Sequence, residues 1–111
     1  MSETPEIRLD HVNLPARKPE WLAEWYAKKF GFRSEGGFVF GFGTLLVFEK
    51  GEPLDYKGKS HFGFRCTDKE SVINLAEKFE LKFKDAENYC AFKAQDPEGN
   101  VFEVYWEDHP R

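Results

Sequence analysis

The sequence predicts an α+β domain in which two related units each run strand, helix and three strands around a small-molecule pocket. Hydrophobic residues follow a strand period, then a helix period, then a strand period again, and this order occurs twice. The two histidines His11 and His61 each precede a glutamate, Glu20 or Glu70, by the same nine positions. An internal repeat of this kind indicates pseudo-symmetric halves of one structure, with equivalent strand faces turned toward a shared concavity.

In the first unit, residues 7–14 alternate enough to predict a strand that ends at Pro15. Lys18-Pro19-Glu20 is typical of a helix start, because proline suits the first turn and the acidic side chain suits the helix dipole. The helix should run to about Phe30, with Gly31 as its C-terminal cap. Three strands are expected after it, at 32–35, 38–42 and 44–50.

The second unit repeats this scheme. Residues 61–66 alternate as a strand, Thr67 or Asp68 is a plausible N-cap, and 72–79 has helical spacing. Further strands are expected at 81–84, 89–94 and 101–106, the last two joined by the turn Asp96-Pro97-Glu98-Gly99.

Composition limits the classes of function. With 111 residues and 41% hydrophobic residues, the chain suits one domain, with units at about 5–50 and 60–107 and a linker at 51–59. A net charge of −4 argues against non-specific nucleic-acid binding. We expect no membrane span, a cytoplasmic location, and free thiols at Cys66 and Cys90, which lack metal or redox spacing.

Strand alternation predicts which side chains face the concavity, because residues two apart share a face. His11 shares its face with Asn13, and His61 shares its face with Arg65. In the last strand, Glu103 shares its face with Tyr105, and apolar residues take the opposite face in all three strands. Two imidazoles and one carboxylate from separate strands form a ligand set suited to iron, manganese, zinc or nickel.

These residues and motifs resemble the vicinal oxygen chelate superfamily of glyoxalases, bleomycin resistance proteins, fosfomycin thiol transferases and extradiol dioxygenases. The resemblance covers nearly the whole chain. Four segments carry it: Leu9-Asp10-His11-Val12, the Trp25-Tyr26 helix ending at Phe30-Gly31-Phe32, Ser60-His61-Phe62, and Asp96-Pro97-Glu98-Gly99-Asn100-Val101-Phe102-Glu103.

The resemblance implies the glyoxalase/bleomycin resistance fold, in which two βαβββ modules form a cupped mixed sheet with helices on its outer face. It also implies a homodimer and a divalent metal ion of undetermined identity. Carried over by motif, the metal ligands are His11, His61 and Glu103. In such enzymes the metal chelates two adjacent oxygens of the substrate.

One family position departs from the pattern of a true glyoxalase. The fourth ligand of that enzyme, a glutamate, corresponds here to Leu46 or Val47, neither of which binds a metal. Glu49 shares a face with Val47 and is a candidate catalytic carboxylate, although a solvated strand-end glutamate is the commoner case. For a dioxygenase, Tyr105 and Tyr89 are candidate acid/base groups.

We therefore expect a metal-dependent lyase, thiol transferase or dioxygenase that acts on a small oxygenated metabolite or electrophile. The candidate substrate contacts are Asn13, Leu46, Phe48, Arg65 and Lys93. The alternative is a metal-free binding protein that resembles the bleomycin resistance members and holds a flat cationic drug among aromatic side chains. Its candidate aromatic group is Phe38, Phe40, Phe42, Phe48 and Trp106.

Overall fold

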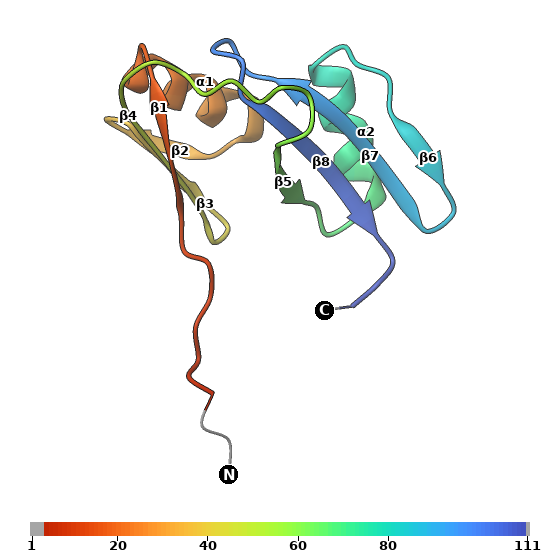
Figure 1. The fold of residues 1–111 in the computed structure, drawn as a ribbon. Coiled ribbons are helices and arrows are strands. Elements are labelled where there is room, and N and C mark those ends of the chain that lie inside the picture. Colours follow the sequence, from red (N-terminus) through yellow and green to blue (C-terminus); the bar gives the residue numbers. More distant parts are fainter. Residues whose placement is uncertain (1–3, 111) are drawn as a thin grey trace.

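The computed structural model describes residues 4–110, which form two four-stranded sheets with one helix each (Figure 1). The first unit comprises β1 (Val12–Ala16), α1 (Pro19–Phe30), β2 (Arg33–Glu35), β3 (Phe38–Gly41) and β4 (Thr44–Lys50). The second comprises β5 (Phe62–Arg65), α2 (Lys69–Lys78), β6 (Lys84–Ala86), β7 (Tyr89–Gln95) and β8 (Val101–Glu107). The predicted α+β class with two βαβββ modules is confirmed.

The two sheets have the same topology, β1-β4-β3-β2 and β5-β8-β7-β6. In each sheet the first pair of strands is parallel and the remaining pairs are antiparallel, so both sheets are mixed. Asn13 lies opposite Val47 in the first sheet, and Gly63 lies opposite Glu103 in the second. Of the two residues that the sequence left open, Val47 is therefore the structural counterpart of Glu103.

Local signals fix the helix ends as predicted. Proline begins α1, and Gly31 ends it in the left-handed conformation at φ 77°, where its N–H donates to the carbonyl of Ala27. At α2 the N-cap is Asp68, whose carboxylate accepts from the backbone N–H of Ser71 at 2.7 Å. Hydrogen bonding to the side chain of Ser71, followed by this backbone bond, lowers the pKa of Asp68.

Two strand predictions are wrong in their bounds. The first strand does not span 7–14 and end at Pro15; β1 is Val12–Ala16 and includes that proline. Only β4 flanks β1, so proline occupies a sheet edge, where a missing N–H is tolerated. The strand expected at 81–84 begins only at Lys84, because Glu80 takes a positive φ of 57° and leaves Leu81 and Phe83 in exposed coil.

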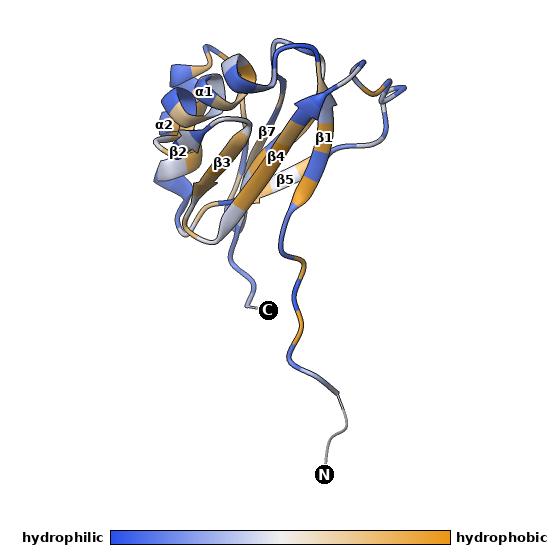
Figure 2. Cartoon of the chain, turned by 90° about the vertical axis from the view of Figure 1, so that its left-hand side faces the viewer, coloured by the Kyte–Doolittle hydropathy of each residue, from blue (hydrophilic) through white to orange (hydrophobic). Residues whose placement is uncertain are grey.

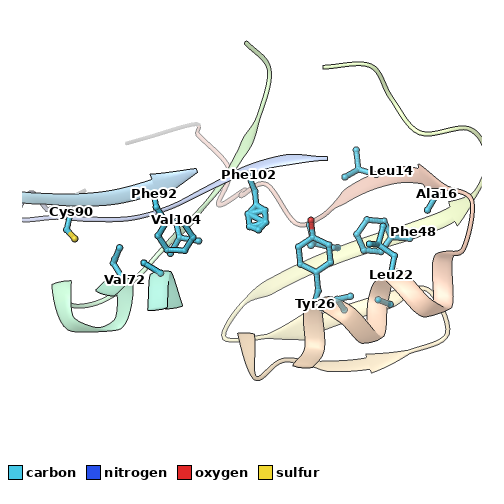
Figure 3. Packing of buried hydrophobic residues seen from close by; sticks show 14 residues of the cluster. Leu14, Ala16, Leu22, Tyr26, Phe48, Val72, Cys90, Phe92, Phe102 and Val104 are labelled. Carbon is cyan, nitrogen blue, oxygen red and sulfur yellow. The ribbon is translucent and has the colours of Figure 1, made fainter. Parts of the chain in front are cut away.

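Both helices cover one face of their sheets, and the core lies in this layer. Figure 2 shows β3 and β4 mainly in the hydrophobic colours. In Figure 3, Tyr26 and Phe48 lie on one side of Phe102, and Val72 and Val104 lie on the other. The Tyr26 and Phe102 ring centroids are 5.7 Å apart, and those of Phe30 and Phe64 are 4.7 Å apart. Aromatic packing therefore joins the two units.

A buried carboxylate also links the units. Asp96 is 5% exposed, and its Oδ2 accepts from the Tyr26 hydroxyl and the Asn100 side-chain amide, both at 2.7 Å. Its Oδ1 accepts from the backbone N–H of Glu98 at 2.8 Å and of Asn100 at 3.1 Å. Burial, followed by the charge of Asp96, raises the pKa of Tyr26 far above its ordinary value. The tyrosine is therefore a neutral donor at neutral pH.

The same turn of the second unit holds the start of α1. The Glu98 carboxylate accepts from the backbone N–H groups of Arg17 at 2.5 Å and Lys18 at 2.9 Å. Tyr56, in the segment between the units, donates to the Asn100 side chain at 2.8 Å. The turn 96–100 therefore fixes α1 and the linker to the second sheet. Within the described residues, no helix is long and apolar enough to cross a membrane.

We expect Tyr26→Phe to lower the free energy of unfolding by about 1–3 kcal/mol, because a buried carboxylate loses one of its donors. Urea unfolding measures this loss. Tyr56→Phe is the matched control, since it removes a half-buried tyrosine hydroxyl that does not reach Asp96. Equal effects of the two variants would contradict the importance assigned to the buried carboxylate.

We expect Gly37→Ala to destabilise the fold by about 1–3 kcal/mol, because the added Cβ would collide with the backbone carbonyl of Phe48. By contrast, a Cβ at Gly63 would meet its nearest atoms at 3.7 Å, an ordinary contact. Gly63→Ala should therefore stay within about 1 kcal/mol of the parent. Thermal unfolding of the two variants side by side checks the difference, and a stable Gly37→Ala protein would disprove the close approach.

Candidate functional site

The face of the second sheet that is turned away from α2 carries most of the polar candidates. Phe62, Phe64, Phe102 and Val104 pack into the core on the helix side of β5 and β8. Alternate residues therefore lie on the opposite face, here called the open face. The ladder registers place these residues on it: Gly63, Arg65, Tyr89, Ala91, Lys93, Glu103, Tyr105 and Glu107.

His61 and Glu103 meet at this face. His61 immediately precedes β5, and its Nε2 lies 3.9 Å from Oε1 of Glu103, with the two side chains 34% and 22% exposed. Its Nδ1 lies 3.3 Å from the carbonyl oxygen of Lys59. A proton on Nδ1 satisfies that carbonyl and leaves the lone pair on Nε2, which is the tautomer that a metal ligand needs. The pair thus combines a nitrogen donor and an oxygen donor at a solvent-accessible position.

Tyr89 holds the other oxygen of this carboxylate. Its hydroxyl donates to Oε2 of Glu103 at 3.2 Å. Burial, followed by the negative charge of Glu103, raises the pKa of Tyr89. The phenol therefore remains a donor at neutral pH. Glu103 is thus bonded on one oxygen and faces an imidazole with the other.

The structure does not bring the third predicted ligand into this pair. His11 precedes β1, and its Nδ1 lies 3.0 Å from the carboxylate of its neighbour Asp10, with both side chains about half exposed. Across residues 4–110 no group of three or more His, Cys, Asp or Glu side chains is placed to hold a metal ion. One chain therefore assembles two of the three predicted donors.

The donor chemistry of that pair fits a divalent cation. Nitrogen and oxygen ligands lie about 2.0–2.2 Å from a bound metal, so two neighbouring ligand atoms lie about 3 Å apart. The 3.9 Å between Nε2 of His61 and Oε1 of Glu103 is wider than that spacing, so the two side chains would have to approach each other to bind one cation. An imidazole with a carboxylate suits zinc, iron, manganese or nickel, and does not choose among them.

The first sheet carries a polar pair at a different position. Glu49 lies two residues beyond Val47, the residue opposite Asn13 in the ladder of β1 and β4, and the amide of Asn13 donates to the carboxylate of Glu49. Glu49 corresponds by register to Tyr105 of the second sheet, not to Glu103. Val47 occupies the ligand position of the first unit, which therefore lacks a carboxylate there.

The other predicted substrate contacts lie in diverse surroundings. Phe48 is 3% exposed and its ring centroid is 5.5 Å from that of Tyr26, so it packs in the core and is not a substrate contact. Leu46 is also buried, although it borders a cavity. Arg65 donates to the carbonyl oxygens of Glu107 at 3.1 Å and His109 at 2.6 Å, which ties it to the C-terminal segment.

Two candidates lie beside Glu103 on the open face. Lys93 is exposed and lies directly opposite Glu103 in the ladder of β7 and β8. Tyr105 lies two residues further along β8, and its ring is 3.7 Å from the position that a Cβ on Gly63 would take. Lys93 thus places a cation, and Tyr105 a phenol, on the face that carries Glu103.

A cavity of about 830 Å³ opens between the two units. Its size is in the range of small-molecule sites. One wall comes from the approach to β1 with the β3–β4 turn, and the other from β5 with the start of α2. Its lining includes five aromatic side chains: Phe30, Phe32, Phe42, Phe62 and Phe64. His11 borders this cavity, but Glu103 does not.

Comparison with known proteins identifies solved structures that have a similar fold. No protein-family model matches the chain, and no curated protein is similar enough in sequence to match it. Among solved structures, a glyoxalase/bleomycin resistance protein/dioxygenase from Alicyclobacillus acidocaldarius has a TM-score of 0.66 at 21% identity, covering 97% of this chain and 96% of its own. Lactoylglutathione lyase from Agrobacterium tumefaciens has a TM-score of 0.64 at 20% identity, covering 92% and 95%.

A third structure, of a protein assigned to the glyoxalase family from Bacillus anthracis, has a TM-score of 0.71 at 15% identity and covers 96% of this chain and all of its own. At identities this low, the structural similarity establishes the fold and leaves the activity open. The similarity spans both units, and it agrees with the equal topology of the two sheets. The chain thus has the fold of the glyoxalase, bleomycin resistance and dioxygenase proteins, the fold that its sequence motifs implied.

Proposed function

We propose that the protein is a divalent-metal-dependent enzyme of the glyoxalase or dioxygenase type, acting on a small oxygenated metabolite or electrophile. The observation that carries this proposal is the meeting of His61 and Glu103 at the open face, with a free nitrogen and a free oxygen 3.9 Å apart. An imidazole nitrogen and a carboxylate oxygen, both partly exposed to solvent, are ligand atoms that divalent metals accept. A divalent cation bound there would act as a Lewis acid on adjacent substrate oxygens.

The third ligand, in this proposal, is His11 of a second copy of the chain. Support comes from the apolar surface near it: Ile7 is 82%, Leu9 86% and Phe42 96% exposed. Leu9, Phe42 and His11 all border the same cavity, so these apolar side chains and the histidine belong to one region. Exposed apolar side chains gathered in this way are typical of an interaction surface. A homodimer that buries them would also bring a His11 to each site.

The residues around the pair have separate tasks in this function. His61 and Glu103 hold the cation, and Tyr89 keeps Glu103 oriented. Lys93, opposite Glu103, is placed to attract an anionic group of the substrate. Tyr105 shares this face and is the candidate proton donor or acceptor. Glu49 is held by Asn13 on the first sheet, so it joins the site only if the dimer brings that sheet face to it.

Metal analysis tests the proposal directly. Protein purified without chelator from metal-supplemented cells is expected to contain stoichiometric divalent metal, and His61→Ala is expected to lose it, because the imidazole supplies a ligand. His109→Ala is the matched control, since this third histidine is exposed and its Nδ1 contacts only the neighbouring Pro110 carbonyl among the contacts the structure shows. A metal-free parent protein, or equal metal in the two variants, would rule the proposal out.

A subunit-mixing experiment tests the shared site separately. His11→Ala and His61→Ala are each expected to lose metal, but a refolded one-to-one mixture should regain about a quarter of the parent content. Half of the random dimers are mixed, and each mixed dimer has one complete site of its two. Recovery of no metal in the mixture, with a metal-loaded parent, would show that each site is built from a single chain.

The cavity favours a second candidate function, the metal-free binding of a flat cationic ligand. Five phenylalanines line it, and the chain carries a net charge of −4, which attracts cations. Of the aromatic residues considered for such binding, Phe42 borders the cavity, whereas Phe48 is buried in the core. Thermal stabilisation by a flat cationic drug that binds no metal itself, unchanged by chelator and lost in Phe42→Ala, would favour this function over the enzyme.

A further inference from the structure

We propose that Tyr89 is a positioning residue for the metal site: it binds one oxygen of Glu103 so that the carboxylate presents only its other oxygen to the cation. This inference rests on the proposed metal-dependent function. It adds a residue that touches neither metal nor substrate and that acts through the ligand Glu103.

The hydrogen bond between Tyr89 and Glu103 joins two residues that are not opposite each other in the ladder of β7 and β8. Tyr89 lies opposite Glu107, whereas the residue opposite Glu103 is Lys93. Four residues of strand separate Tyr89 from Lys93, a distance of about 13 Å. The phenol can close the gap to 3.2 Å only by leaning toward Glu103 along the open face. Ala91, between them on that face, is small enough to leave the path clear and is only 6% exposed.

The first unit has no counterpart of Tyr89, because its strand β3 is shorter than β7. β7 spans seven residues, Tyr89–Gln95, whereas its counterpart β3 spans four, Phe38–Gly41. Phe38 lies opposite Val47 as Lys93 lies opposite Glu103, so the part of β7 that precedes Lys93 has no equivalent in β3. The unit with an apolar residue at the ligand position therefore lacks the strand extension that would hold a carboxylate.

The two carboxylate oxygens of Glu103 therefore have different partners. Oε2 accepts from Tyr89 at 3.2 Å, and Oε1 faces Nε2 of His61 at 3.9 Å. A neutral hydroxyl bonds the carboxylate without cancelling its charge, which a lysine or arginine in the same place would do. Bonded ligands of this kind hold their orientation before the metal arrives, and losing such a bond weakens metal binding by about 10- to 100-fold. Glu103 would therefore offer one oxygen, Oε1, to a bound cation.

Cobalt(II) titration of the metal-free full chain tests this assignment, because cobalt(II) reports both affinity and coordination through its visible absorption. Tyr89→Phe keeps the ring and removes only the donor. It is expected to weaken cobalt binding by about 10- to 100-fold and to change the spectrum as Glu103 becomes free to bind through both oxygens. Tyr56→Phe, which removes a half-buried hydroxyl bonded to Asn100, is expected to match the parent in both readouts.

The outcomes separate the inference from the function on which it rests. If the parent binds no cobalt, the proposed function fails and the role of Tyr89 fails with it. If the parent binds cobalt and Tyr89→Phe matches it in affinity and spectrum, the positioning role alone is wrong. A lower melting temperature of metal-free Tyr89→Phe with unchanged affinity and spectrum would assign the residue to packing, and it would also overturn the inference.

Discussion

The buried carboxylate of Asp96 is the constraint on which the arrangement of the two units depends. It accepts four hydrogen bonds, two from side chains and two from the backbone of its own turn. One donor, Tyr26, comes from α1 of the other unit. A buried carboxylate is costly unless its hydrogen bonds are complete, so the units can close only in the orientation that brings Tyr26 to Asp96. Aromatic packing then adds stabilisation, and the hydrogen bonds supply the specificity.

The turn that carries Asp96 is next to the candidate site in the sequence. The turn 96–100 leads straight into β8, which carries Glu103, and Glu98 of the same turn caps the approach to α1. Asp96 and Glu103 therefore lie on one continuous segment, the turn 96–100 followed by β8. Within that frame the two sheets have equal topology but unequal chemistry, since Val47 stands where the second sheet has Glu103, and β3 lacks the extension that holds Tyr89. The two units are therefore alike in their backbone but not in their side chains, and the ligand pair lies on the second sheet.

The fold could be predicted from the sequence because its signals are local. Proline at the start of α1, Gly31 after its end and the strand alternation around Glu103 each act within a few residues. The bounds of β1 and β6 could not be predicted as well, because strand ends depend on partners distant in sequence. Residues 7–11 alternate as a strand does, yet β4 pairs only from Val12 onward. Leu81 and Phe83 likewise alternate, but the chain is still turning away from α2.

The candidate site could be predicted only in part, for a related reason. Alternation correctly placed Glu103 opposite the core face, but the distance between His61 and Glu103, and the absence of His11 from that pair, depend on how the units are joined. Phe48 was expected to contact the substrate, whereas the structure buries it against Tyr26. The links from Tyr26 to Asp96 and from Tyr89 to Glu103 span 70 and 14 residues, and no local signal marks either bond.

X-ray absorption at the edge of the metal that copurifies with the protein would test the central claim most directly. The account requires nitrogen and oxygen scatterers at about 2.0–2.2 Å from the metal. It also requires the outer-shell pattern of two imidazoles, one from His61 and one from His11. A first shell of sulfur, or of water oxygens with no imidazole signal, would show that the cation is held elsewhere and that the meeting of His61 and Glu103 has another purpose.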